Sequence, residues 1–170
     1  MAETTRAVFS VHIRGTIDAV WREITKTDEP QGAMFNMCLD TKGLAPGEKI
    51  FMRTPNGKFT GVVGEVLEFD PPHKYSHTFK FTNYDDPPCK VTYELTEKDG
   101  GVEFKLIVDD MPVGTKTAKD MTGGGKMIVN TLKAIVETGR PPMFTRGLYR
   151  MFALLGPLMT PKRCRSENWR

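Results

Sequence analysis

Residues 116–137, KTAKDMTGGGKMIVNTLKAIVE, decide the fold of this chain. Their apolar side chains recur at helical spacing, which predicts one long amphipathic helix over this stretch. The glycine run 123–125 is costly inside a helix, by about 1 kcal/mol per residue relative to alanine. We therefore expect regular helix to begin only after this run. Gly139 and the proline pair at 141–142 then end the helix.

Five segments upstream of this helix alternate apolar and polar residues with the period of a β-strand. Turn sequences separate them, such as PNG at 55–57 and KDGG at 98–101. One face of the resulting sheet is apolar and the other is polar, which is typical of an antiparallel sheet packed on one side. The predicted strands are 49–54, 59–69, 75–81, 90–96 and 102–108.

The N-terminal part adds another strand and two short helices. Residues 8–14 alternate as a strand, and Thr16 caps a helix with the sequence TIDAVWREIT. Pro30 lies near the first turn of a second short helix, which carries Met34 and Met37. This order of elements predicts an α+β fold: a curved antiparallel sheet wraps around the long C-terminal helix, with two short helices after the first strand.

The charge of the chain is gathered at its C-terminal end. The 170 residues carry a net charge of +3, but residues 140–170 alone hold seven cations and one carboxylate, Glu167. We therefore divide the chain into a domain of residues 1–139 and a basic amphipathic extension of residues 140–170. A net charge this small does not favour nucleic acid as a partner.

The sequence carries no pattern for a metal site, for export or for a membrane span. Cys38, Cys89 and Cys164 lie far apart and show no zinc-ligand spacing. The first residues lack the pattern of a signal peptide. The longest apolar run, 151–159, is too short to span a bilayer. We expect a cytoplasmic protein with reduced thiols, no metal and no cofactor.

Several local sequences, together with the order of elements, resemble the START-like or SRPBCC superfamily. They are TIDAVWREIT, GKFTGVVGEVLEFDPPHKYSHTF and MIVNTLKAIVETG, and the likeness covers about residues 6–139. The resemblance implies the helix-grip fold of the birch-pollen allergen. Within the superfamily the chain is most similar to the branch named after the activator of heat-shock protein 90 ATPase. Relatives include lipid carriers, polyketide cyclases, hormone receptors and a co-chaperone domain, so a shared fold does not transfer the chemistry.

The chain departs from this branch at two places. Members often carry a tryptophan in the second helix and another at the start of the long helix. Here the first place holds Ala33, Met34 and Phe35, and the second holds Gly124 and Gly125. Ligand contacts of those tryptophans therefore cannot be carried over, and the smaller residues imply more room or a cavity of different shape.

The inner face of the sheet and the apolar stripe of the helix predict a cavity between them. His77 lies on that face and is either a hydrogen-bonded core residue or the polar anchor of a ligand. No Asp or Glu is in phase with it, so a general-base role lacks an orienting partner. The many methionines either pack the core or form a pliable lining. The predicted ligand-binding residues are Met34, Met37, Met52, His77, Phe79, Phe81, Met121, Gly125 and Ile128, and no catalytic residue is predicted.

We predict a non-enzymatic module that binds a small apolar or lipid-like molecule. One alternative is a cyclase or dehydrase that uses His77 and Tyr75. Another, implied by the resemblance, is a co-chaperone or protein-interaction domain with a chaperone as its partner. Residues 144–155 of the extension predict a basic amphipathic helix, which docks on its own domain or on a second subunit of a homodimer, or lies less commonly on an anionic membrane surface.

Overall fold

The computed structural model describes residues 3–170 and shows a seven-stranded sheet wrapped around a long helix. The strands are β1 (Thr4–Ile13), β2 (Cys38–Thr41), β3 (Lys49–Arg53), β4 (Thr60–Asp70), β5 (Lys74–Phe81), β6 (Cys89–Lys98) and β7 (Gly101–Pro112). All pair antiparallel, in the order β1-β7-β6-β5-β4-β3-β2. The α+β helix-grip prediction is confirmed. Sequence periodicity did not predict β2, because four residues are too few to show an alternation.

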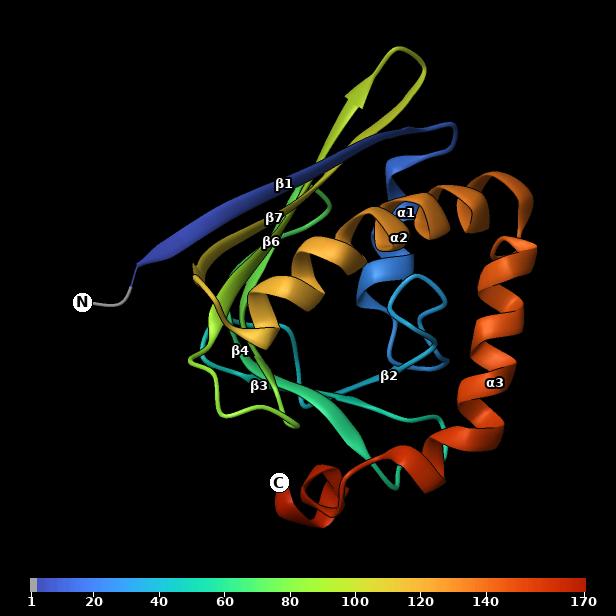
Figure 1. The fold of residues 1–170 in the computed structure, drawn as a ribbon. Helices are drawn as coiled ribbons and strands as arrows, with labels where there is room; N and C mark the ends of the chain where they lie inside the picture. Colours follow the sequence, from blue (N-terminus) through green and yellow to red (C-terminus); the bar gives the residue numbers. More distant parts are fainter. Residues whose placement is uncertain (1–2) are drawn as a thin grey trace.

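Helix α2 (Lys116–Thr138) lies along the concave side of the sheet (Figure 1). It begins at its cap Thr115, whose hydroxyl accepts from Ala118 N at 3.1 Å, and it runs unbroken through the glycines. The expected late start after the glycine run was therefore wrong. Burial of the apolar stripe, which includes Val129 and Leu132, outweighs the low helix propensity of those glycines. Gly139 ends the helix with a φ of 81°, as predicted.

One of the two short helices predicted after β1 is absent. Helix α1 (Ile17–Thr25) forms as expected, with the Thr16 hydroxyl accepting from Ala19 N at 3.2 Å. The second segment is instead a series of turns closed by a bridge between Gln31 and Met37. Its Phe35 has a φ of 54°, in the left-handed region, and the next residue does the same, which is incompatible with a right-handed helix.

The extension forms α3 (Met143–Met159) and two single-turn 3₁₀ helices, η1 (Lys162–Cys164) and η2 (Ser166–Asn168). In Figure 1, α3 stands apart from the strands, and the chain then returns to the end of the β3–β4 hairpin. There Ser166 N donates to Lys58 O at 2.9 Å, and Cys164 is buried. The terminal part of the extension thus docks on its own domain. No helix within residues 3–170 is long and apolar enough to cross a bilayer.

Candidate functional site

A cavity of about 600 Å³ lies between the inner face of the sheet and α2. Strand β5 and helix α2 line two of its sides, and residues 31–37 contribute a third. The structure brings all nine sequence-predicted residues to its wall. They are Met34, Met37, Met52, His77, Phe79, Phe81, Met121, Gly125 and Ile128. Their role in binding a ligand stays a prediction.

The aromatic side chains of the wall come from alternate positions of β5. Successive residues of a strand point to opposite faces, so Tyr75, His77, Phe79 and Phe81 share the inner face. The rings form a continuous row: the centroids of Tyr75 and His77 are 5.2 Å apart, and those of Phe79 and Phe81 are 4.8 Å apart in an edge-to-face contact. This row gives the cavity one rigid apolar side.

Tyr93 was not among the predicted lining residues, and it matters most because its hydroxyl is the hydrogen-bond partner of His77. It lies on β6 directly opposite Tyr75 of β5, beside His77. Its alternation within β6 was visible in the sequence, but which β5 residue it meets depends on strand register. The other lining residues that were not predicted are Ile24, Gln31, Phe35, Leu39, Ile50, Val62, Val91, Leu106, Lys119, Asp120, Gly123 and Gly124.

His77 is buried, and the direction of its hydrogen bonds follows from its neighbours. Nδ1 lies 2.7 Å from the carbonyl oxygen of Thr78, which can only accept, so Nδ1 carries the hydrogen. Nε2 therefore holds a lone pair and accepts from the Tyr93 hydroxyl at 3.4 Å. Burial lowers the pKa of His77 to about 4, and burial raises the pKa of Tyr93. The pair is uncharged at neutral pH.

Asp120, the carboxylate at the cavity wall, is hydrogen-bonded to Tyr84 and not to His77. Asp120 is exposed on α2 and accepts a hydrogen bond from the Tyr84 hydroxyl at 2.7 Å. Together with the exposed Lys119 it marks the mouth of the cavity. Among the lining residues no other Asp or Glu occurs. The interior is thus largely apolar, and its buried polar groups are the His77–Tyr93 pair, the Tyr75 hydroxyl and the Gln31 amide.

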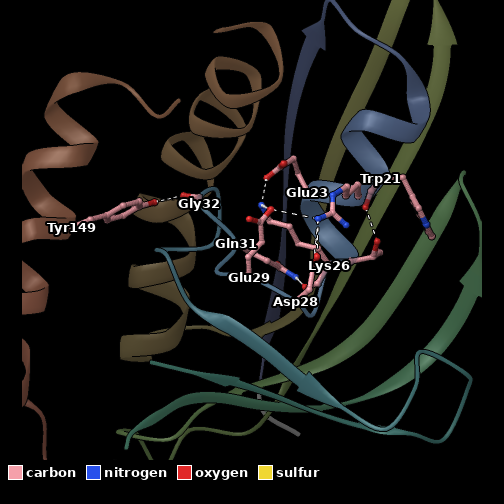
Figure 2. Close-up of polar contacts among 10 residues, drawn as sticks. Trp21, Glu23, Lys26, Asp28, Glu29, Gln31, Gly32 and Tyr149 are labelled. Carbon is pink, nitrogen blue, oxygen red and sulfur yellow. Dashed lines mark hydrogen bonds and ion pairs between the residues drawn. The ribbon is translucent and has the colours of Figure 1, made fainter. Parts of the chain in front are cut away.

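Polar contacts hold the segment that leads from α1 into residues 31–37 (Figure 2). Lys26 Nζ forms ion pairs with Glu23 at 3.0 Å and with Glu29 at 2.9 Å. The buried Gln31 then donates from Nε2 to the carbonyl oxygen of Lys26 at 3.0 Å. These contacts fix the start of a segment that has no helix of its own, so its two methionines face the cavity from a defined backbone.

Gly125 lies on the cavity wall, but the space beside it belongs to another residue. A Cβ at Gly125 would stand closer than 3.0 Å to the ring of Phe9 on β1. A Cβ at Gly124 would instead make an ordinary contact, 3.6 Å from Cζ of Phe35. The smaller residues were expected to give more room or a cavity of different shape, and at Gly125 the structure shows no free room, because Phe9 fills it.

Residues 14–137 match the model of a family described as Activator of Hsp90 ATPase homolog 1-like protein. The chain belongs to this family. This confirms the branch that the local sequences indicated, and it agrees with the helix-grip topology. The comparison with curated proteins yields no significant match.

Solved structures similar to this Activator of Hsp90 ATPase homolog 1-like chain share its fold at low identity. DynU16, from the dynemicin biosynthetic locus, is 20% identical with a TM-score of 0.65, and the match covers 80% of this chain and 48% of the DynU16 chain. The Aha1 dimer from Colwellia psychrerythraea is 13% identical with a TM-score of 0.62, over 79% and 98%. CalU16 from Micromonospora echinospora is 16% identical with a TM-score of 0.58, over 90% and 98%. The chain thus spans about half the length of DynU16 and nearly all of the other two.

Proposed function

We propose that this chain binds a small apolar or lipid-like molecule in the cavity and does not change it chemically. The observation that carries the proposal is a cavity of about 600 Å³ with a largely apolar wall, which includes one uncharged hydrogen-bonded pair, His77 and Tyr93. Ligand pockets usually measure roughly 300–1,000 Å³, with an apolar wall and few polar groups. The volume and lining of this cavity match that description.

The polar pair supports a ligand with one hydroxyl or carbonyl group. The 3.4 Å between Tyr93 Oη and His77 Nε2 is long for a hydrogen bond, so this contact is weak and easily exchanged. A ligand hydroxyl can donate to Nε2 and accept from the tyrosine, and a carbonyl can accept from the tyrosine alone. An otherwise apolar molecule would then leave neither protein group unpaired.

Binding is better supported than the cyclase or dehydrase alternative. A general base works best with a pKa near the operating pH, whereas burial lowers the pKa of His77 to about 4. The one lining carboxylate, Asp120, bonds to Tyr84 at the mouth instead of orienting His77. The unfilled interior also supports binding over a co-chaperone role, which would need only a packed core and an outer surface.

The expected affinity is modest. A ligand that buries roughly 300 Å² of apolar surface gains about 7 kcal/mol at ~25 cal/mol per Å². Immobilising the ligand costs several kcal/mol of this gain. We therefore expect dissociation constants in the micromolar range, which a hydrogen bond to the polar pair would improve.

The test is the binding of the uncharged fluorescent probe N-phenyl-1-naphthylamine. Ile128→Trp adds a large ring to the cavity wall, whereas Lys126→Trp places the same ring on the exposed side of α2. We expect saturable binding to the parent and to Lys126→Trp, and at least tenfold weaker binding to Ile128→Trp, with all three folded by circular dichroism. Equal binding of the probe by both variants would show that it binds outside the cavity and would contradict the proposal. Native mass spectrometry of the purified chain should also reveal any molecule carried in the cavity.

A further inference from the structure

Helix α3 is amphipathic, but its polar side faces the domain. Thr145 is buried, and the Tyr149 hydroxyl donates to the carbonyl oxygen of Gly32 at 2.5 Å (Figure 2). Thr145 and Tyr149 lie one turn apart on the same side of the helix. An ordinary surface helix turns its apolar side to the core and its polar side to water. This helix has the opposite orientation.

The apolar side of α3 faces solvent along its whole length. Its large side chains are between 45% and 84% exposed. At 3.6 residues per turn they cover about half of the helix circumference. They are Met143, Phe144, Met151, Phe152, Leu154, Leu155, Leu158 and Met159. We call these eight residues the α3 apolar face. A continuous exposed surface of this kind marks an interaction site.

The charges of the segment that carries the α3 apolar face are all positive. Residues 138–166 contain no Asp or Glu and six Lys or Arg. Of these, Arg140, Arg150 and Lys162 are exposed and form no ion pair within residues 3–170. They lie before, within and after α3. The surface that covers the apolar face should therefore be negatively charged.

We propose that α3 docks this protein on an anionic lipid membrane surface. The α3 apolar face enters the boundary between headgroups and acyl chains, and Arg140, Arg150 and Lys162 meet the anionic headgroups. A second copy of the chain fits less well. Paired helices bury a narrow stripe, whereas this face covers half the circumference. Two copies would also bring like charges together with no carboxylate in 138–166 to neutralise them.

Both ends of α3 are held, so the face is presented in a fixed position. Tyr149, in the N-terminal half of α3, bonds to Gly32. After α3, Arg163 Nε donates to the carbonyl oxygen of Thr82, the residue that follows β5, at 2.9 Å, and Ser166 N donates to Lys58 O in the β3–β4 hairpin. Gly32 belongs to the 31–37 segment, which lines the cavity. Helix α3 is thus hydrogen-bonded to the segment that contributes Gln31, Met34, Phe35 and Met37 to the cavity wall. The membrane proposal stands whether or not a ligand is found.

Flotation with vesicles of 70% phosphatidylcholine and 30% phosphatidylserine tests this proposal on the full chain. Leu154→Glu/Leu158→Glu adds two charges to the apolar face at sites 77% and 84% exposed, so folding should be unaffected. The matched control, Val8→Glu/Val113→Glu, adds the same charge at exposed apolar residues on β1 and just after β7, outside the C-terminal extension. We expect the parent and the control to bind, and the α3 variant to bind at least tenfold more weakly. Binding should also fall on pure phosphatidylcholine and at high salt.

Two results would overturn the proposal. One is a parent chain that fails to float with the anionic vesicles. The other is a parent chain that is dimeric by sedimentation velocity and does not bind vesicles, together with a Leu154→Glu/Leu158→Glu variant that is monomeric. This result would assign the α3 apolar face to contact with a second copy of the chain. Thermal unfolding of each variant, followed by circular dichroism, shows whether the fold is intact.

Discussion

The ring of Phe9 on β1 occupies the space into which a side chain at Gly125 of α2 would project. A Cβ there would approach three ring atoms more closely than 3.0 Å. By contrast, a Cβ at Gly123, two residues earlier in the same helix, would meet no atom within 4 Å. Two glycines of one run therefore differ: Gly125 permits close packing of α2 on the sheet, whereas Gly123 has open space beside it and lowers the helix propensity.

Alanine substitutions at these two glycines should change stability in opposite directions. Gly123→Ala adds helix propensity without a clash and should raise the free energy of unfolding by about 0.5–1 kcal/mol. Gly125→Ala gains the same propensity but overpacks against Phe9, which typically costs about 1–3 kcal/mol. Urea unfolding of both variants measures the difference. If Gly125→Ala is as stable as Gly123→Ala, the close contact of α2 with β1 is wrong.

Stability should fall on acidification because of His77. Burial lowers the pKa of the folded-state imidazole from 6.5 to about 4. Between these two pH values the unfolded chain takes up a proton that the folded chain excludes. The stability is therefore complete above pH 6.5 and is lost progressively as the pH falls towards 4, by up to about 3 kcal/mol.

Urea unfolding at pH 7 and at pH 4.5 measures this contribution. His77→Phe should reduce the difference between the two free energies of unfolding, whatever the variant's stability at pH 7. His73→Gln, in the exposed turn before β5, is the control and should leave the difference as in the parent. An unchanged pH dependence in His77→Phe would show that the imidazole is not buried in the folded state.

Removing one hydroxyl should change the preference of the cavity for polar ligands. Tyr93→Phe keeps the ring and deletes the group that donates to His77 Nε2. We expect the affinity for decanol, measured by displacement of N-phenyl-1-naphthylamine, to fall about fivefold, since a net hydrogen bond contributes about 1 kcal/mol. The affinity for decane should stay the same. An equal loss for both ligands would indicate a change of cavity shape instead of a lost hydrogen bond.

Deleting residues 162–170 should destabilise the domain. The deletion removes the buried Cys164 and the bond from Arg163 Nε to Thr82 O, and it uncovers the end of the β3–β4 hairpin. Losses of this kind total a few kcal/mol of folding free energy. In a domain of this size, each kcal/mol lost lowers the melting temperature by roughly 2–4 °C. Differential scanning calorimetry should show the shift. Leu154→Glu/Leu158→Glu, in the same extension, should melt like the parent.

The amino-acid sequence by itself determined the elements and the sides they bury. Alternation along 75–81 and the helical stripe in 116–137 are local patterns, and each directly predicts which residues face a common interior. For this reason the predicted lining residues of β5 and α2 meet at one cavity wall. The same local reasoning failed for the predicted second helix, where two residues with positive φ turn the chain back.

Only the tertiary structure decided the contacts between distant segments. The pairing of Tyr93 with His77 depends on the register of β6 against β5, and the loss of space at Gly125 depends on where Phe9 of β1 lies. The sequence also showed that α3 is amphipathic, but the anchors at Tyr149 and Arg163 turn its apolar side outward. Periodicity along the chain specifies which side chains share a face, whereas the neighbour of that face is set by contacts between residues far apart in sequence.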